Sequence, residues 1–353
     1  MSDRNVIISA KDVEVTFSMR GKQLRAIRKC SIDIYEGETL AIVGESGSGK
    51  SVFTKTFVGM LDKNGRVSGG SILYHGQDLA AYTKESQWRK IRGGRIAMVM
   101  QDPMTSLNPL KTIGSQIRES IELHQDLHGD AAYKATIEMI DKVGIPDPEK
   151  RYRQYPHELS GGMRQRIVIA IACACKPEIL ICDEPTTALD VTIQNQILDL
   201  IRNLKKELNM TVIFITHDLG VVANIAERVA VMYAGQLVEV GMAEEIFYDA
   251  WHPYTWALLQ ALPQLGTKGE KLPTIDGTPP SLYDQIKGDA FAPRNKMALA
   301  IDFVEEPPWF DVSKTHKAKT WYLDPRCPKF ERPEHVTHFH ERLLKLYGED
   351  QDG

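Results

Sequence analysis

The sequence predicts an α/β fold built around a parallel β-sheet and a phosphate-binding loop. Continuous apolar runs at residues 40–43, 179–182 and 212–216 have the length and composition of buried parallel strands. Helical patterns alternate with these runs along the chain, as in α/β sheets. The first run leads directly into residues 44–51, Gly-Glu-Ser-Gly-Ser-Gly-Lys-Ser, which match the phosphate-loop pattern G-x-x-x-x-G-K-[ST].

Bulk composition is that of an ordinary globular protein. The 353 residues suffice for two domains, or for one large domain with an appendage, and 42% are hydrophobic and 25% charged. The net charge of −4 argues against a bulk nucleic-acid binder. No apolar run approaches membrane-spanning length, and the polar start lacks a signal-peptide profile.

Five cysteines are present, and Cys173, Cys175 and Cys182 lie in apolar stretches. An odd number of buried thiols favours a reduced, cytosolic compartment. The Cys173-x-Cys175 pair lacks zinc-type spacing and a second pair, so we interpret it as core packing.

Periodicity predicts the remaining elements. Strands are expected at residues 6–18, 31–34, 70–74 and 95–100, and helices at 113–123, 131–143, 162–175 and 192–208, with a loop at 105–109. The helical interval of about 102–175 interrupts the sheet and is expected to form a subdomain. Beyond about residue 241 prolines dominate a loop-rich tail, which predicts one domain at 1–255 and a second unit at 256–353.

The loop at 44–51 has a direct chemical interpretation. Its glycines let successive backbone N–H groups of Gly44, Glu45, Ser46, Gly47, Ser48 and Gly49 curl around an anion, and the helix that follows adds partial positive charge. Lys50 can reach the outer phosphates, and the Ser51 hydroxyl can bind Mg²⁺. A strand before the loop and a helix after it disfavour the alternative of an accidental Gly/Ser turn.

The apolar strand at 179–182 ends in two acids, Asp183 and Glu184. In a phosphate-loop protein the first is placed to hold Mg²⁺ and the second to polarise an attacking water. Two surface acids at a strand end would be the ordinary alternative without the loop at 44–51.

A second glycine-rich segment, Leu-Ser-Gly-Gly-Met at residues 159–163, also opens a predicted helix. One nucleotide does not need two γ-phosphate sites on one chain, so we expect Ser160, Gly161 and Gly162 to close over a nucleotide held by another subunit. Here the chain resembles the ATP-binding-cassette (ABC) ATPases, whose signature is LSGGQ. Met163 replaces the final glutamine, while the serine and glycines are intact.

The resemblance assigns further roles by position. Gln101 resembles the glutamine that binds Mg²⁺ or water beside the membrane partner, and His217 resembles the histidine that contacts the γ-phosphate. Residues 188–190 resemble the loop that crosses the dimer interface through Asp190. Phe17 is the candidate for stacking on adenine, although a core phenylalanine in a strand is an open alternative.

Longer segments narrow the resemblance to the oligopeptide, dipeptide and nickel importer branch, and within it to the D-type ATPase subunits of oligopeptide permeases. The segments are residues 101–109, 159–166, 252–259 and 277–282. The implied architecture is an ABC ATPase core with a β-subdomain, an α-helical subdomain and a loop-rich C-terminal extension.

One departure concerns four cysteines that many members of this branch carry in the extension and that can hold an iron–sulfur cluster. The matching positions are Asp289, Asn295, Asp302 and Thr320. Cys327 alone cannot replace four thiolates, so no iron–sulfur cluster is predicted.

Two polar clusters remain. Residues 84–95 are basic and contain Trp88, which could suggest nucleic acid or lipid headgroups, but a solvated surface helix is favoured. His335, His338 and His340 could bind a metal, but their polar end segment favours no such site.

The resemblance implies an ATPase that uses ATP and Mg²⁺, the latter held by Ser51, Asp183 and Gln101, to power oligopeptide import. It implies a heterodimer with a paired F-type ATPase subunit, two transmembrane permeases, an extracellular peptide-binding protein and a peripheral location at the cytoplasmic face of the cell membrane. No nucleic-acid partner is expected. The alternatives are a dipeptide or nickel importer, or a soluble ABC ATPase acting on ribosomes or DNA; the sequence does not identify the solute.

Overall fold

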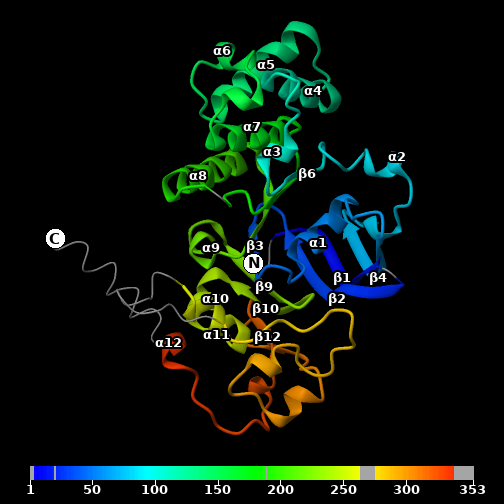
Figure 1. The fold of residues 1–353 in the computed structure, drawn as a ribbon, viewed down its shortest axis with the longest axis vertical. Helices are drawn as coiled ribbons and strands as arrows, with labels where there is room; N and C mark the ends of the chain where they lie inside the picture. The colour runs from blue at the N-terminus through cyan, green and yellow to red at the C-terminus, as the bar shows by residue number, and fades with distance from the viewer. Residues whose placement is uncertain (1–3, 20, 188, 263–274, 338–353) are drawn as a thin grey trace, which may run out of the picture.

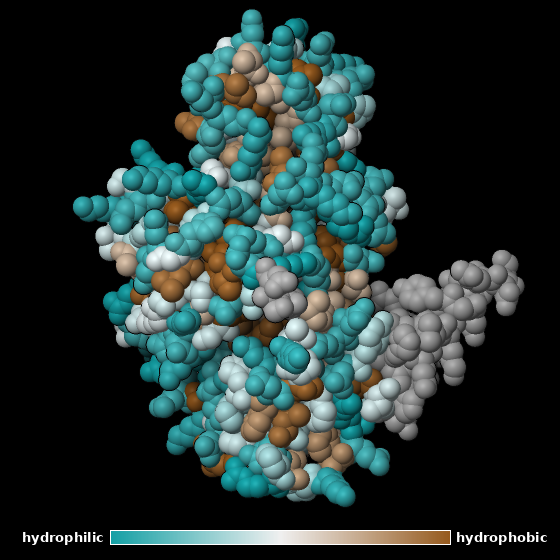
Figure 2. All heavy atoms as spheres, turned by 180° about the vertical axis from the view of Figure 1, so that it is seen from behind, coloured by the Kyte–Doolittle hydropathy of each residue, from teal (hydrophilic) through white to brown (hydrophobic). Residues whose placement is uncertain are grey.

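The computed structural model describes residues 4–19, 21–187, 189–262 and 275–337. Figure 1 shows an elongated molecule with a helical lobe at one end, a central sheet, a second sheet beside it and the C-terminal extension at the opposite end. Figure 2 shows the same outline from behind, with apolar groups scattered among hydrophilic ones. Among the described residues, no helix combines the length and the apolar character that crossing a membrane requires.

The central sheet has eight strands in the order β11-β12-β10-β9-β3-β8-β7-β6. Neighbouring strands from β9 to β6 run parallel, whereas the pairs that involve β10, β11 and β12 are antiparallel. The strands are β3 (Thr39–Val43), β6 (Ile96–Val99), β7 (Ile179–Asp183), β8 (Thr211–Thr216), β9 (Arg228–Tyr233), β10 (Gln236–Met242), β11 (Trp309–Asp311) and β12 (Lys317–Lys319). All residues of β3, β7, β8 and β9 are buried, so the predicted α/β fold with a parallel core is confirmed.

An antiparallel sheet in the order β2-β1-β4-β5 lies beside the central one. Its strands are β1 (Val6–Met19), β2 (Lys22–Tyr35), β4 (Gly65–Tyr74) and β5 (Gln77–Asp78). Its apolar face packs with α1 (Lys50–Lys55) and η1 (Thr56–Val58) in one hydrophobic cluster. The predicted strand at 31–34 is only the end of β2, because charged residues earlier in that strand obscure its alternation.

The helical lobe packs around an aliphatic stripe. Ile113, Ile117 and Ile121 of α4 meet Ile140 of α5 and Ile167 of α7 in one core. The helices are α3 (Pro103–Ser106), α4 (Ile113–His124), α5 (Gly129–Lys142), α6 (Pro148–Tyr152), η3 (Pro156–Glu158), α7 (Gly161–Ala174) and α8 (Val191–Leu208). The single turn α3 lies partly where a loop was predicted, because Asp102 caps its Met104 N–H and Pro103 occupies its first position.

The basic segment at 84–95 lies at the surface, as predicted, but only part of it is helical. It contains one helical turn, α2 (Glu85–Trp88), preceded by η2 (Leu79–Ala81). Trp88 packs so closely on Gly59 that a β-carbon there would lie 2.3 Å from its ring. Arg92 donates to the carbonyls of Val58 and Gly59 at 2.7 and 2.8 Å, which holds the segment against the core.

The C-terminal extension shares the central sheet, since β12 pairs with β10 at the sheet's edge. Rings of Tyr233, Tyr254, Phe291, Trp256 and Tyr322 lie in a cluster that joins the extension to the core. The helices of this half are α9 (Leu219–Ile225), α10 (Ala243–Tyr248), α11 (Pro253–Gln260), η5 (Ala292–Arg294), η6 (Ala300–Phe303), η7 (Trp321–Leu323) and α12 (Glu334–Thr337). The boundary at 255/256 stays a prediction.

Candidate functional site

The phosphate loop turns tightly between β3 and α1. Gly44, Gly47 and Gly49 have φ of +153°, +80° and +107°, values that favour glycine. A β-carbon on Gly44 would lie 2.1 Å from the carbonyl oxygen of Met232. The sequence therefore needs glycine here both for the turn and for the close approach to β9.

Lys50 is buried at the start of α1, with 5% of its surface exposed. Its Nζ donates to the carbonyls of Gly44 and Glu45 at 2.7 and 2.9 Å. Burial lowers the pKa of this amine, and the nearby carboxylates of Glu184, Asp183 and Glu45 oppose that shift. The amine is thus held at the mouth of the loop, where it can exchange its carbonyl partners for phosphate oxygens.

The two acids at the end of β7 differ in their surroundings and in their backbone conformation. Asp183 is buried, and its Oδ1 accepts a 2.8 Å hydrogen bond from the Ser51 hydroxyl. Burial raises the pKa of the Asp183 carboxyl, and the hydrogen bond from Ser51 partly offsets the shift. Glu184 follows with φ of +47°, a left-handed conformation that non-glycine residues seldom adopt.

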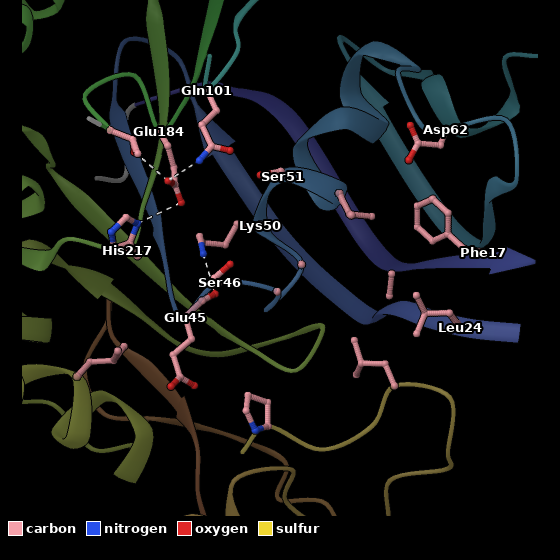
Figure 3. A pocket seen from close by; sticks show the side chains of 18 of the residues that line it. Phe17, Leu24, Glu45, Ser46, Lys50, Ser51, Asp62, Gln101, Glu184 and His217 are labelled. Atoms are coloured by element: carbon pink, nitrogen blue, oxygen red, sulfur yellow. Dashed lines mark hydrogen bonds and ion pairs between the residues drawn. The ribbon is translucent and has the colours of Figure 1, made fainter. Parts of the chain in front are cut away.

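Three side chains hold the Glu184 carboxylate in place, as Figure 3 shows for two of them. Gln101 Nε2 and Thr187 Oγ1 donate to its Oε2 at 3.2 and 2.9 Å, and His217 Nδ1 lies 3.2 Å from its Oε1. Residues from β7, from the loop after β6 and from the loop after β8 therefore converge on one carboxylate. Such an arrangement can orient a water molecule for attack on a phosphate.

A cavity of about 1090 Å³ extends from these groups to the antiparallel sheet. Phe17 lines its far end, 8% exposed, and packs over Gly65, so it is both a core residue and a cavity wall. Among the predicted residues, the cavity is lined by Phe17, Glu45, Ser46, Gly47, Gly49, Lys50, Ser51, Gln101, Glu184 and His217. Gly44 and Asp183 lie immediately behind this lining, as their hydrogen bonds with Lys50 and Ser51 show. Ser48 is buried in the same loop, and its N–H donates to the carbonyl of the lining residue Glu45 at 3.2 Å.

Sequence reasoning missed several lining residues. Thr187 has one signal, a short polar loop directly after the two acids. The extension supplies Leu258, Ala261, Ile275, Pro279 and Leu282. The segments at 252–259 and 277–282 were interpreted only as a family resemblance. No periodicity or motif in these residues indicates that they reach a phosphate loop more than 200 positions earlier.

The predicted second half of the site lies elsewhere. Ser160 caps α7 by accepting from the Met163 N–H at 3.3 Å, and Asp190 caps α8 by accepting from the Ile193 N–H at 2.9 Å. Neither residue lines the cavity, and neither does Gly161 or Gly162. Ser160, Gly161 and Asp190 are exposed. Ala188, predicted with Asp190 to form the interface loop, lies outside the described residues.

The positions matched to cluster cysteines serve local structure. Asp289 accepts from the Phe291 N–H at 2.9 Å, Asp302 from the Leu299 N–H at 2.7 Å, and Thr320 from the Tyr322 N–H at 3.3 Å. Asn295 donates to the Tyr322 hydroxyl at 3.3 Å. Among the described residues no group of three or more His, Cys, Asp or Glu side chains is placed to hold a metal ion, and the absence of an iron–sulfur cluster stays a prediction.

The remaining thiols and histidines take no part in the cavity lining. Cys30, Cys173, Cys175 and Cys182 are buried and Cys327 is partly buried, all as thiols. Burial raises the pKa of Cys30 and of Cys173 to about 12, so both stay protonated and inert at neutral pH. His338 and His340 lie outside the described residues, as does the side chain of His335.

Known proteins match the whole described architecture. The family described as ABC transporter matches residues 27–187, and the one described as Oligopeptide/dipeptide transporter, C-terminal region, matches residues 238–301. The oligopeptide transport ATP-binding protein AmiE of Streptococcus pneumoniae is 57% identical over 98% of each chain. The dipeptide transport ATP-binding protein DppD of Lactococcus lactis is 53% identical over 97% of this chain and 98% of the relative.

Solved structures agree with the fold. The dimeric ATP-binding cassette MJ0796, solved in a post-hydrolysis state with ADP and Pi, has a TM-score of 0.60 and 26% identity, covering 67% of this chain and 98% of that one. The cbiO1 protein of Clostridium perfringens, part of an ABC transporter complex, also has a TM-score of 0.60, with 27% identity over 69% of this chain and 92% of that one. The resemblance predicted from the motifs is thereby confirmed: this chain is an ABC ATPase and belongs to the family of oligopeptide and dipeptide transport ATP-binding proteins.

Proposed function

We propose that this chain is the ATP-hydrolysing subunit of an ABC importer and that it powers the uptake of oligopeptides across the cell membrane. The observation that carries the proposal is 57% identity, over 98% of each chain, to a protein named as an oligopeptide transport ATP-binding protein. The match of residues 238–301 to the C-terminal region of such transporters supports the same branch.

ATP would place its phosphates on residues 44–51. The loop's backbone N–H groups and the Lys50 amine are suited to phosphate oxygens, and the amine already points to the loop's mouth. Phe17 would stack on the adenine at the far end of the cavity, next to Leu24. The cavity's length and its two chemically distinct ends support this orientation of the nucleotide.

Mg²⁺ would be held by Ser51, Asp183 and Gln101. Hydroxyl, carboxylate and amide oxygens form the donor set that this hard cation prefers, and a buried carboxylate with a raised pKa suits a site that gains a cation's charge. When bound, Mg²⁺ supplies charge compensation for the β- and γ-phosphate oxygens. The hydroxyl of Ser51 keeps the Asp183 carboxylate oriented toward the phosphate loop.

Glu184 would orient the hydrolytic water and accept its proton. General-base assistance of this kind contributes about 10²–10⁴ in rate. His217 is 57% exposed and lies beside the Glu184 carboxylate, from where it can reach the γ-phosphate. Gln101 and Thr187 would keep the carboxylate from rotating away between turnovers.

The site would be completed by another subunit. Ser160, Gly161 and Gly162 lie outside the cavity with the exposed Asp190, which suits a surface that closes over a partner's nucleotide. The partner would be a paired F-type ATPase subunit in a heterodimer, bound beneath two transmembrane permeases that receive peptide from an extracellular binding protein. This chain would then sit peripherally at the cytoplasmic face of the membrane, and Gln101 with the helical lobe would pass motion to the permeases.

Dipeptides are a second candidate cargo, because one relative of 53% identity is named as a dipeptide transport protein. Nickel import remains a third option in the same branch. A soluble ATPase acting on ribosomes or DNA is the rival from another class, and co-sedimentation with ribosomes instead of permease-dependent membrane association would support it.

Peptide uptake in cells tests the proposal. Cells lacking this gene would receive the wild-type chain, Glu184→Gln or the surface control Glu207→Gln, and would be offered labelled pentapeptide, dipeptide or nickel. We expect pentapeptide uptake with the wild type and the control but not with Glu184→Gln. Undiminished uptake with Glu184→Gln would overturn the proposed role, and loss of dipeptide or nickel uptake alone would reassign the cargo.

A further inference from the structure

One arginine of the C-terminal extension is bonded to the phosphate loop. Arg294 Nη1 and Nη2 donate to the two carboxylate oxygens of Glu45 at 2.6 and 3.0 Å, as a bidentate pair. Its other N–H groups donate to the Tyr233 hydroxyl at 3.2 Å, the Ile275 carbonyl at 3.2 Å and the Asp276 carbonyl at 2.8 Å. All five guanidinium donors are therefore used, and the side chain is 3% exposed.

The backbone of Glu45 is held by the same half of the chain. Its N–H donates to the hydroxyl of Tyr254 at 2.7 Å, and Tyr254 is fully buried in α11. The Tyr254 ring packs on Tyr233 and Phe291, with centroid distances of 4.5 and 5.4 Å. Figure 3 shows the Glu45 side chain pointing away from Lys50 and toward the extension. One residue of the phosphate loop thus has both its side chain and its peptide fixed by residues beyond β8.

The extension also forms a wall of the nucleotide cavity. Ile275, Pro279 and Leu282 line it together with Phe17 and Leu24. The Leu282 carbonyl accepts from the Arg25 N–H at 3.0 Å, which attaches this wall to β2. Arg294 hydrogen-bonds to the carbonyls of Ile275 and Asp276, so the wall and the phosphate loop share one anchor.

We propose that residues 275–294 are a working part of the nucleotide site, with Arg294 as a positioning residue that acts on the phosphate loop through Glu45. This inference rests on the proposed binding of ATP in this cavity. It gives the extension a role in nucleotide affinity and makes the extension's arrangement depend on whether the cavity is filled.

Electrostatics explain why the loop needs this arginine. Glu45 places a carboxylate at the edge of an anion-binding loop, 28% exposed and close enough to act on Lys50. Without a counter-charge that carboxylate would repel the incoming phosphates and compete for the Lys50 amine. Arg294 neutralises it and turns it away, and the bidentate pair raises the pKa of the guanidinium further above its ordinary value, so the counter-charge is permanent.

Nucleotide binding by the purified full-length chain tests the inference, with a fluorescent ATP analogue as the probe. The variants are Arg294→Ala, Glu45→Gln, the double variant and Arg326→Ala. Arg326 is the matched control, because it is 83% exposed in the extension and pairs with Asp324 instead of the loop. We expect Arg294→Ala to weaken binding roughly tenfold and Arg326→Ala to leave it unchanged.

The double variant separates positioning from simple loss of structure. If the carboxylate is the cause, Glu45→Gln in the Arg294→Ala background restores affinity to within about twofold of Glu45→Gln alone, since the unpaired charge is gone. A double variant as weak as Arg294→Ala, or an Arg294→Ala variant equal to the control, would overturn the inference. Thermal unfolding of each variant shows whether it is folded at the assay temperature.

Hydrogen exchange on the unmodified chain covers the case in which Arg294→Ala does not fold. We expect ATP to slow amide exchange in residues 275–283 as well as in residues 44–51; slowing in the loop alone would overturn the inference. Lys50→Ala separates failure of the proposed ATP binding from failure of the role of Arg294. If the wild type binds the analogue no better than Lys50→Ala does, both the proposed function and the inference are refuted. Tight binding by the wild type with no effect of Arg294→Ala refutes the inference alone.

Discussion

The two glycine-rich segments of this chain, residues 44–51 and 159–163, both open helices yet stand in different surroundings. The first lies against a cavity of about 1090 Å³, with a buried lysine and two acids within reach. The second caps α7 with Ser160 at the protein surface, outside the lining of that cavity.

This contrast teaches that an anion-binding sequence becomes a site only where charged side chains converge on it. Lys50, Asp183 and Glu184 are brought to the first segment by β3 and β7, which lie on either side of β8 in the sheet. The second segment has N–H groups and a helix start, so it can complement a phosphate that something else holds.

Glu184→Gln should lower the rate of ATP hydrolysis by about 10²–10⁴ while ATP still binds, because the amide keeps the side chain's shape but cannot accept a proton. The rate is measured as phosphate release by the assembled transporter, with Glu207→Gln as the control. Hydrolysis at the wild-type rate would show that Glu184 is not the general base. It would contradict the proposal that the catalytic groups lie beside residues 44–51.

Lys50→Ala should weaken ATP binding to the isolated chain by roughly a hundredfold, because a buried, charge-assisted partner of the phosphates is lost. Equilibrium binding of a fluorescent analogue reports the affinity. Normal ATP binding in this chain's own cavity, with loss of ATP only from the partner subunit's site, would contradict the role given to residues 44–51.

Ser160→Ala should leave ATP binding to the isolated chain unchanged and lower hydrolysis by the assembled transporter at least tenfold, because the lost hydroxyl would serve a nucleotide on the other subunit. It should also cost about 1 kcal/mol of stability through loss of the α7 cap. Thr112→Ala is the matched control, since it removes the cap of α4 and is expected to affect stability alone. Equal hydrolysis by the two variants would make Ser160 purely structural.

Asp183→Asn should alter the pH dependence of stability. Burial raises the pKa of the Asp183 carboxyl above 3.8, so the folded state keeps this proton to higher pH than the unfolded state does. The wild type therefore loses unfolding free energy relative to Asp183→Asn as pH rises from about 4 through the raised pKa. Urea unfolding of both proteins at pH 4 to 7 measures the difference; a constant difference would contradict the buried-charge account.

The smallest expected effect compares a glycine from each segment. Gly47 has φ of +80°, so Gly47→Ala strains the backbone and should cost about 1 kcal/mol. Gly161 lies in the first turn of α7, and an added β-carbon meets nothing within 4 Å, so Gly161→Ala should raise stability by roughly 0.5 kcal/mol. Urea unfolding measures the free energy of unfolding of both variants. A change of the same sign in the two variants would refute the contrast in backbone geometry.

The sequence was sufficient for the parts of the fold and site that local patterns encode. Continuous apolar runs identified β3, β7 and β8. The motif that follows β3 indicated Lys50 and Ser51, and the two acids at the end of β7 indicated Asp183 and Glu184. These residues can be predicted because the carboxyl ends of parallel strands lie at one edge of the sheet. A motif at the end of such a strand is therefore expected at that edge.

Contacts between distant segments could not be predicted in the same way. The pair Arg294–Glu45 spans 249 positions and depends on how the aromatic cluster seats the extension. Strands β11 and β12 have three residues each, too short for any alternation to show. The surface helix predicted at 84–95 is only one turn long, Glu85–Trp88, because Trp88 and Arg92 contact the core around Gly59, and no helical period encodes those contacts.

Photo-crosslinking in intact cells tests whether each glycine-rich segment is half of a site shared between subunits. A benzophenone amino acid at His157, an exposed position just before residues 159–163, would be activated with and without ATP, and the crosslinked peptides identified by mass spectrometry. We expect an ATP-dependent crosslink to the phosphate loop of a different ATPase subunit. A crosslink to residues 44–51 of the same chain, or one that ATP does not change, would contradict it.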